Sequence, residues 1–164
     1  QTEERFDAII VDSSEPIGPS AVLHTRAFFT DCKRALKPGG VLVTQNGLPF
    51  LFPEHLAETS AIFASLFEAT SPYLCTQPCY FGGPFALNWA SDDETLLAVP
   101  DPTLTRRLGQ RGIATRYYPP AVHRASFARP AYVLAAIGAD GTAPAKPKSR
   151  AAPQPGKARG TRKR

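Results

Sequence analysis

The sequence predicts an α/β fold in which two parallel strands are followed by an antiparallel hairpin. Three observations support this prediction: a short apolar run at residues 6–11, an amphipathic segment at residues 25–36, and a second apolar run at residues 41–44. Strand, helix, glycine turn and strand make a βαβ unit, in which the two strands are parallel and the crossover is right-handed.

Each element of this unit has a local signature. Consecutive apolar and β-branched residues predict a buried strand from Phe6 to Val11. The helix over residues 25–36 follows from apolar residues at helical spacing: Ala27, Phe28, Cys32, Ala35 and Leu36. Lys-Pro-Gly-Gly at residues 37–40 predicts the end of that helix, because proline and glycine do not continue it. Residues 41–44 then predict a second buried strand.

A second helix and a hairpin follow. Pro53 suits a first helical position, and apolar residues then recur on one face, which predicts a helix over residues 53–67. Residues 73–77 and 85–90 predict two strands, and Phe-Gly-Gly-Pro at residues 81–84 suits a tight reversal between them.

The last part of the predicted domain is helical. A short helix is expected over residues 103–111, and a longer helical region over residues 122–137 is interrupted at Pro130. Beyond Gly138 the chain has no large apolar residue, so residues 139–164 are expected to form a disordered tail. The sequence thus predicts one domain over residues 1–138 and a tail over residues 139–164.

The charge of the chain is divided between these two parts. The net charge is +5 overall, but the tail carries eight basic residues and one acid, +7 in all, which leaves residues 1–138 at −2. A mildly acidic domain suits a cationic ligand better than nucleic acid. We therefore expect no nucleic-acid binding beyond weak, salt-sensitive contacts of the tail.

The sequence also bears on compartment. The apolar runs are shorter than the about 20 residues that span a bilayer, and no secretory signal is visible, so no membrane association is expected. Cys32, Cys75 and Cys79 form neither a paired spacing nor a His-Cys cluster, which favours reduced thiols in a cytoplasmic protein and no metal site. The chain opens on Gln1 shortly before a strand, which suggests a piece of a longer protein.

Polar loops follow the two parallel strands. Asp-Ser-Ser-Glu-Pro-Ile-Gly-Pro occupies residues 12–19 directly after the first strand, and Gln45-Asn46-Gly47 follows the second. Ligands of open α/β sheets bind outside the carboxyl ends of the strands, so both loops are expected on one rim. Tyr80 and the glycines after it lie between the hairpin strands, and the sequence leaves their edge open.

The acids Asp12 and Glu15 have two readings. Both could serve only a turn, since Asp and Ser bond backbone amides and Pro sets φ. A carboxylate directly after a buried strand is instead expected to be partly desolvated, and a pair of them favours a bound cation, a general base, or both. His24 and His55 have no partner in sequence and are expected to be surface residues.

Several segments together resemble the C-terminal half of the spermidine synthase (polyamine aminopropyltransferase) family. The resemblance runs from about Phe6 to Ala136, and the loop at residues 12–19 is the most specific segment. The other matching segments are CKRALKPGG at 32–40, VTQNG at 43–47, PCYFGGP at 78–84, WAS at 89–91, YY at 117–118 and VHRASF at 122–127. The segment at 32–40 is shared by methyltransferase-like folds and discriminates little.

The resemblance implies a Rossmann-like, methyltransferase-type sheet and a reaction. Family members transfer an aminopropyl group from decarboxylated S-adenosylmethionine to putrescine, which gives spermidine and methylthioadenosine. By position, Asp12 matches the catalytic proton acceptor. The stretch that holds the diamine is matched by Asp12, Ser13, Ser14 and Glu15, and positions facing the amine pocket by Gln45 and Tyr80. Pro19 matches the adenine side of the nucleoside site. No metal and no permanently bound cofactor are implied, and a homodimer is expected of the full-length form.

Two departures from the family pattern limit what the resemblance implies for this chain. The family more often has Asp at the position of Glu15. No Gly-x-Gly loop follows a strand here, so the front, nucleoside-binding half has no counterpart and the chain alone is expected to be inactive. A class I methyltransferase and a non-catalytic polyamine-binding remnant are the alternatives. The methyltransferase has no need of the acid pair.

Overall fold

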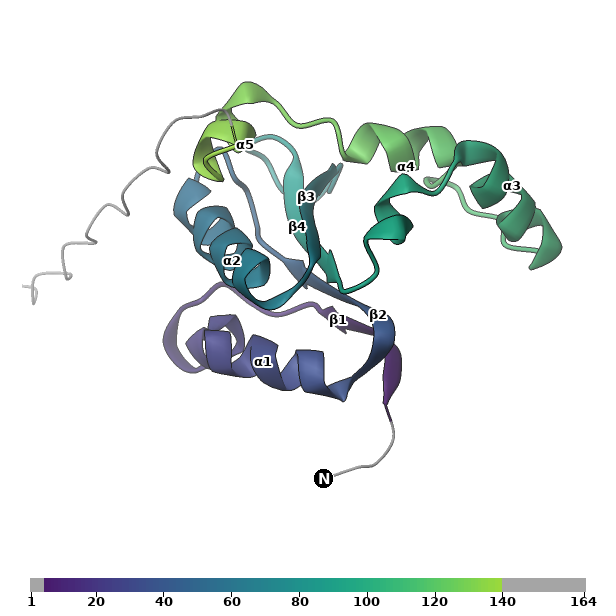
Figure 1. Ribbon diagram of the computed structural model, residues 1–164. Helices are drawn as coiled ribbons and strands as arrows, with labels where there is room; N and C mark the ends of the chain where they lie inside the picture. Colours follow the sequence, from purple (N-terminus) through teal and green to yellow (C-terminus); the bar gives the residue numbers. More distant parts are fainter. Residues whose placement is uncertain (1–4, 140–164) are drawn as a thin grey trace, which may run out of the picture.

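A four-stranded mixed sheet forms the centre of the computed structural model, which describes residues 5–139 (Figure 1). The strands lie in the order β1-β2-β4-β3. Their bounds are Phe6–Val11 for β1, Leu36–Gln45 for β2, Ala69–Cys75 for β3 and Phe85–Ser91 for β4. The predicted tail at residues 139–164 lies outside the described residues from residue 140 on, so it stays a prediction.

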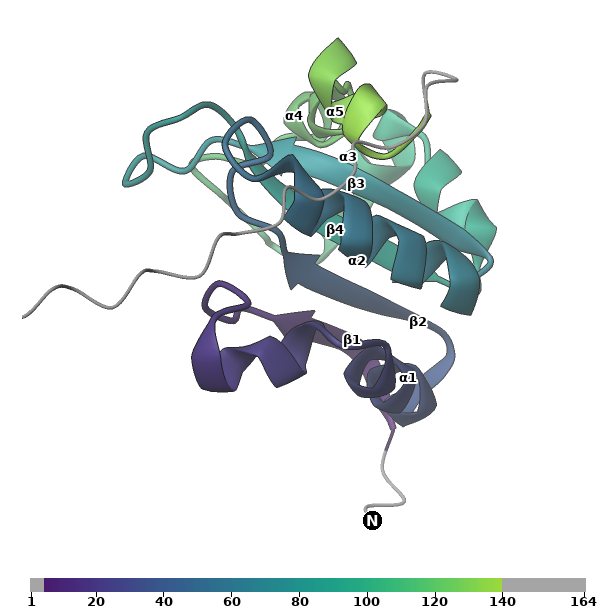
Figure 2. The same cartoon turned by 90° about the vertical axis from the view of Figure 1, so that its left-hand side faces the viewer.

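Helices lie on both faces of this sheet (Figures 1 and 2). One face is covered by α1 (Arg26–Ala35), α2 (Pro53–Leu66) and α5 (Ala131–Ala136), with the 3-10 helix η1 (Gly18–His24) leading into α1. The 3-10 helix η2 (Glu94–Ala98), α3 (Asp101–Gln110) and α4 (Pro120–Ser126) lie toward the other face. The rings of Tyr73 on β3 and Phe127 after α4 are 5.5 Å apart, which places α4 against the hairpin. The predicted helices are confirmed within a few residues at their ends.

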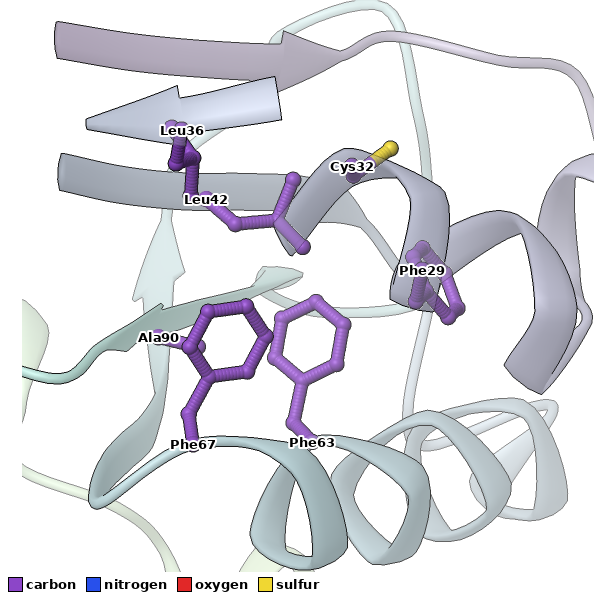
Figure 3. Packing of buried hydrophobic residues seen from close by; sticks show 7 residues of the cluster. All are labelled: Phe29, Cys32, Leu36, Leu42, Phe63, Phe67 and Ala90. Atoms are coloured by element: carbon purple, nitrogen blue, oxygen red, sulfur yellow. The ribbon is translucent and has the colours of Figure 1, made fainter. Parts of the chain in front are cut away.

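The core fills the space between α1, α2 and the sheet (Figure 3). The buried side chains there are Phe29, Cys32, Leu36, Leu42, Phe63, Phe67 and Ala90. The rings of Phe29 and Phe63 meet edge to face, 5.0 Å apart, which adds to their burial. Phe29 was not among the predicted inward residues of α1, whereas Ala27, which was, is exposed.

The βαβ unit is confirmed, since β1 and β2 pair in parallel with Ile10 opposite Val43. The antiparallel pairing of the hairpin is confirmed as well. Its first strand lies at Ala69–Cys75 and not at residues 73–77, and residues 76–84 form a longer connection in place of the expected tight reversal at residues 81–84. β4 also lies antiparallel against β2, with Gln45 opposite Leu87. The first residues of β4 therefore lie beside the last residues of β2, so the β3–β4 connection joins the rim where β1 and β2 end. The strand order therefore shows at which edge of the sheet the connection with Tyr80 lies, which the sequence left open.

The segment Lys37–Gly40 differs from the prediction. It was expected to separate helix from strand, but α1 ends at Ala35 and β2 already begins at Leu36. Phe6 pairs with Leu36 and Ala8 with Val41, so β2 uses five steps where β1 uses two. Gly39 takes a φ of +71° in this excursion, a conformation that glycine adopts without steric cost. The glycines thus lie in an irregularity of the β1–β2 pairing, inside β2 and not before it.

The predicted burial of β1 is wrong. β1 is an edge strand of the described sheet, and Phe6 and Ile10 are 49% and 74% exposed. Ile9 and Val11 pack against the core on the α1 side, while Ile10 on the opposite face has no cover among residues 5–139. An apolar run is typical of a parallel strand that is covered on both faces. Here β1 is covered only on the face that packs against α1.

Cys32, Cys75 and Cys79 are all free thiols, as the sequence predicted. Burial raises the pKa of the Cys32 thiol, with the charge of Asp31 adding to the effect, and burial raises the pKa of Cys75. Across residues 5–139, none of the helices has the length and apolar character needed to cross a bilayer.

Candidate functional site

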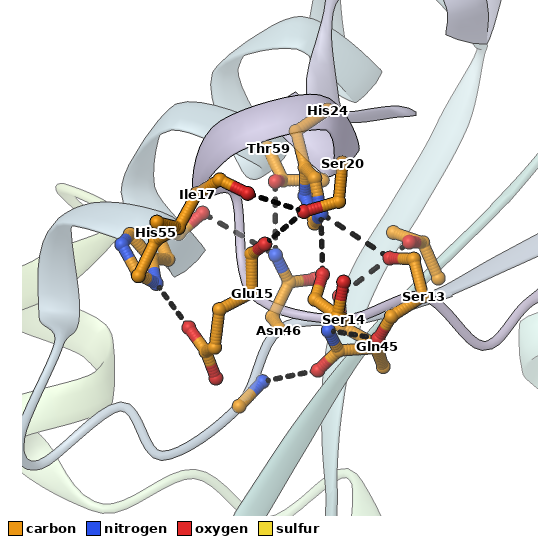
Figure 4. A network of polar contacts seen from close by, with 12 residues as sticks. Ser13, Ser14, Glu15, Ile17, Ser20, His24, Gln45, Asn46, His55 and Thr59 are labelled. Carbon is orange, nitrogen blue, oxygen red and sulfur yellow. Dashed lines mark hydrogen bonds and ion pairs between the residues drawn. The ribbon is translucent and has the colours of Figure 1, made fainter. Parts of the chain in front are cut away.

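The loop after β1 and the end of β2 are joined by the side chain of Gln45. Its Nε2 donates to the carbonyl oxygen of Ser13 at 2.8 Å, and its Oε1 accepts from the backbone amide of Gly47 at 3.0 Å. Gln45 is 7% exposed, so the two hydrogen bonds satisfy a nearly buried amide. The prediction that the two polar loops share one rim is confirmed, and Figure 4 shows the resulting network.

His24, the last residue of η1, holds the same loop from the other side. Its Nε2 lies 3.2 Å from Ser13 Oγ and 3.0 Å from the carbonyl oxygen of Ser14. A carbonyl oxygen only accepts, so Nε2 is the protonated nitrogen in the contact with Ser14. The loop is therefore fixed at Ser13 and Ser14 by two side chains, from β2 and from η1.

Glu15 turns toward the first turn of α2. Its Oε2 lies 3.2 Å from Nδ1 of His55, whose ring stacks on Phe52 at a centroid distance of 5.6 Å. Its Oε1 lies 3.0 Å from the position that a Cβ on Gly47 would occupy. Gly47 has a φ of +64°, so the missing side chain permits both the backbone turn and the approach of the carboxylate. The second acid is thus held between α2 and the β2 loop.

Asn46 links the rim to α2. Its Nδ2 donates to Thr59 Oγ1 at 2.8 Å and to the carbonyl oxygen of His55 at 3.3 Å. Its Oδ1 is buried and has no hydrogen-bond partner among the residues that the structure describes. The end of β2 therefore fixes the turn of α2 from which His55 projects.

Asp12 differs from Glu15 in its surroundings. It is exposed directly after β1, and within residues 5–139 no cationic side chain lies at ion-pair distance from it. Glu15 is also exposed, with 46% of its side chain accessible. The expectation that burial at the end of a strand partly desolvates these acids is wrong, because β1 is an edge strand and the chain leaves it toward solvent. What makes these two acids a candidate site is therefore their negative charge and their position at the rim, and not burial.

Tyr80 and Pro19 lie farther along the same two connections. Tyr80 is 53% exposed, its ring stacks on Phe85 at the start of β4 at 5.3 Å, and the start of β4 lies at this rim. Pro19 is exposed in the first turn of η1. Neither has a polar contact with the loop at residues 12–15, so their predicted roles stay predictions.

The two histidines are the residues that sequence reasoning missed. His24 and His55 were expected to be surface residues without partners, but both contact the loop at residues 12–15. His24 lies 11 residues from Ser13, and His55 is 40 positions from Glu15. No local pattern marks the second contact, because it arises only when α2 packs on the sheet, against β3 and β4.

Aromatic side chains line a separate cavity of about 250 Å³ on the α4 side of the sheet. Burial raises the pKa of Tyr73 to about 12, with Cys75 and Tyr118 adding smaller effects. Burial lowers the pKa of His123, against an opposing effect of Asp101. Its Nδ1 lies 2.7 Å from the hydroxyl oxygen of Tyr118, which satisfies both groups. This cavity has none of the acids of the rim.

Comparison with known proteins places the chain in a family. The family model for the spermine/spermidine synthase domain matches residues 1–98. The chain is 46% identical over 133 residues to the polyamine aminopropyltransferase of Ruegeria sp. (strain TM1040), a match that covers 81% of this chain and 47% of the relative. It is 47% identical over 137 residues to polyamine aminopropyltransferase 1 of Pseudomonas aeruginosa, covering 84% of this chain and 48% of that one.

Solved structures show the same likeness. A spermidine synthase in complex with the transition state analogue AdoDATO superposes with a TM-score of 0.73 at 28% identity, covering 82% of this chain and 45% of that one. Spermidine synthase from Thermotoga maritima gives a TM-score of 0.71 at 28% identity, covering 82% and 44%. These likenesses confirm the predicted Rossmann-like, methyltransferase-type fold. The chain spans about half the length of the relatives that it matches, and it belongs to the spermine/spermidine synthase family.

Proposed function

We propose that this chain is the amine-binding part of a polyamine aminopropyltransferase of the spermidine synthase type, with putrescine as acceptor and decarboxylated S-adenosylmethionine as co-substrate. The observation that carries the proposal is the loop at residues 12–15, which bears two carboxylates and whose backbone is held at the rim by the hydrogen bond from Gln45 to the carbonyl oxygen of Ser13. The names of the relatives support the reaction class.

The acids suit a diamine. Alkylamines have a pKa near that of Lys, about 10.4, so putrescine carries two positive charges near neutral pH. Asp12 presents a carboxylate without a competing cation among residues 5–139, and Glu15 presents a second one from the same loop. Two carboxylates at one rim attract a dication, and the geometry of the loop orients it.

The transfer then needs a free lone pair on the attacking nitrogen. Asp12 accepts or relays a proton from the ammonium group, and the amine nitrogen attacks the aminopropyl carbon that is bonded to the sulfonium. A carbon–nitrogen bond forms and the carbon–sulfur bond breaks. The electron pair of the broken bond stays on sulfur, which leaves as the neutral thioether of methylthioadenosine. No step requires an oxidant or a reductant.

The nucleoside side of the reaction is only partly represented. Pro19 is the one residue that we assign to it, by resemblance, and no Gly-x-Gly loop follows a strand in this chain. We therefore propose that the chain alone does not turn over, and that activity requires a polypeptide that supplies the remaining half. Cytoplasmic location fits the three free thiols, since such thiols persist in reducing compartments. The homodimer remains a prediction from the resemblance.

Binding tests the amine assignment directly. Calorimetric titration of the chain with putrescine at low salt is expected to show saturable binding that Asp12→Asn weakens about tenfold or more. Butylamine, which has one ammonium group, is expected to bind more weakly than putrescine. Asp31→Asn, which removes an exposed carboxylate on α1, is the matched control. Equal affinity of Asp12→Asn and the unchanged chain for putrescine would contradict the assignment.

Activity tests the reaction. The chain joined to the N-terminal half of the Pseudomonas aeruginosa relative is expected to form spermidine from putrescine and decarboxylated S-adenosylmethionine. Transfer of a methyl group from ordinary S-adenosylmethionine by the same fusion would favour a methyltransferase instead. Spermidine formation by the isolated chain would overturn the proposal that it is only a part.

A further inference from the structure

His55 occupies a place that a substrate amine would be expected to take. Its Nδ1 lies 3.2 Å from Glu15 Oε2, and its side chain is only 21% exposed (Figure 4). A carboxylate accepts hydrogen bonds and does not donate them, so Nδ1 carries a proton in this contact. Glu15 therefore already has an internal donor, which becomes an internal cation when the ring is protonated on both nitrogens.

The position of His55 is fixed independently of Glu15. The ring stacks on Phe52 with an angle of 14° between the planes. Its backbone carbonyl accepts from Asn46 Nδ2, which ties the first turn of α2 to the end of β2. The imidazole is thus a positioned group that can in turn orient the Glu15 carboxylate.

We infer that His55 positions the Glu15 carboxylate in the amine site and that its second proton competes with a substrate ammonium group for that carboxylate. The inference rests on the proposed function, since it assigns Glu15 to the amine. Neutral His55 orients Glu15 with one N–H. Doubly protonated His55 neutralises Glu15 and repels a diammonium ion nearby. Diamine binding then favours the neutral ring, so binding releases a proton.

The charged groups near His55 lie on the loop at residues 12–15, on η1 and on α2. Glu15 is the partner from the loop, and Glu54 and Glu58 lie on α2 itself, in adjacent and next-turn positions. Asp12 belongs to the same loop, and His24 contacts that loop at Ser13 and Ser14. Among these residues, an ion pair at the rim joins only Glu15 and His55 in the described part of the chain. Histidine exchanges its proton between about pH 5 and 8, where carboxylates and alkylamines keep their charges.

Two variants of His55 separate positioning from packing. Asn places an amide nitrogen near the position of Nδ1, so His55→Asn keeps a neutral donor. His55→Phe keeps the stack on Phe52 and loses the donor. At pH 7.5, His55→Asn is expected to bind putrescine within about twofold of the unchanged chain, whereas His55→Phe binds roughly three- to tenfold more weakly, in the range of ordinary coupling between sites. Equal losses in both variants would overturn the positioning role.

The competition is tested by calorimetry of the 164-residue chain with putrescine between pH 5.5 and 7.5. The unchanged chain is expected to gain roughly three- to tenfold in affinity as the pH rises, and to release protons on binding when buffers of different ionisation enthalpy are compared. His55→Asn is expected to show neither effect, and Glu58→Gln, which removes a neighbouring charge on α2, to behave as the unchanged chain.

The outcomes distinguish the two levels of the proposal. Putrescine binding without pH dependence, or with the same dependence in His55→Asn, overturns the competition between His55 and the amine and leaves the amine site standing. Absence of putrescine binding at every pH overturns the proposed function, and the role of His55 with it.

Discussion

Gln45 Nε2 donates to the carbonyl oxygen of Ser13 across 2.8 Å, which makes one buried side chain the link between two strands of the rim. The same amide accepts from the backbone of Gly47 through Oε1. Because Gln45 is 7% exposed, its amide has little access to bulk water that could replace these hydrogen bonds. The position of the acidic loop thus depends on a residue that carries no charge itself.

Gln45→Glu tests that dependence. The substitution keeps the shape of the side chain but puts a carboxylate oxygen against the Ser13 carbonyl, so that carbonyl loses its donor and two acceptors face each other, while the Gly47 amide keeps its acceptor. We expect a loss of about 1–3 kcal/mol in the free energy of unfolding and weaker putrescine binding. Urea unfolding and calorimetry measure the two effects, with Gln110→Glu at the exposed end of α3 as control. An unchanged unfolding midpoint in Gln45→Glu would argue against the link.

Gly47→Ala tests the contact between the β2 loop and Glu15. The new Cβ would lie 3.0 Å from Glu15 Oε1, and alanine at a φ of +64° is strained. Gly112→Ala has a similar φ of +61° with open space around it, so it reports the strain alone. Gly112→Ala is expected to lose about 1 kcal/mol of stability from strain, and Gly47→Ala at least as much. Weaker putrescine binding is expected only of Gly47→Ala, and equal binding by the two would contradict the packing of Glu15 there.

Asp12→Asn tests the proposed role of Asp12 as proton acceptor, in the fusion with the N-terminal half of the Pseudomonas aeruginosa relative. General-base catalysis contributes about 10²- to 10⁴-fold, so kcat is expected to fall by that order. Circular dichroism should show an unchanged fold, because Asp12 is exposed and makes no ion pair among residues 5–139. A kcat within about threefold of the parent, far short of the expected loss of about 10²-fold or more, would contradict this role of Asp12.

His123, which lies away from the rim, is expected to make the stability of the folded chain depend on pH. Burial lowers its pKa in the folded chain, with Asp101 opposing, so the unfolded chain binds the proton at higher pH than the folded one. Stability is therefore retained above the unfolded value of about 6.5 and falls as the pH drops toward the folded value. We expect the loss of Tm between about pH 7 and 5.5 to be smaller in His123→Asn than in the parent. Parallel curves for the two proteins would contradict this.

Phe63→Ala tests the core shown in Figure 3. Phe63 is fully buried and contacts the rings of Phe29 and Phe67 at 5.0 and 5.8 Å. Removing a buried phenyl ring costs about 3–5 kcal/mol, from lost transfer energy and the cavity that remains. Phe81→Ala removes a ring that is 91% exposed and is expected to change stability by less than about 0.5 kcal/mol. Comparable losses in urea unfolding would argue against the observed core.

Local patterns predicted most elements of the fold. Residues 6–11 form a strand at the predicted bounds, and Pro53 begins a helix as expected. These elements depend on neighbouring residues, since hydrophobic period and proline position act within a few positions. The burial of β1 was predicted wrongly, because burial depends on what covers a strand and not on the strand's own composition.

The order of elements, the parallel pairing of the first two strands and the presence of two acids after the first strand all follow from local sequence patterns. The position of β4 between β2 and β3, which brings the connection at residues 76–84 to the rim, is seen only in the folded chain. The folded chain also brings Glu15 to His55, while Asp12 stays free of a cation within the described residues. Such contacts join residues tens of positions apart. They depend on how the helices pack on the sheet, and no local sequence pattern predicts that packing.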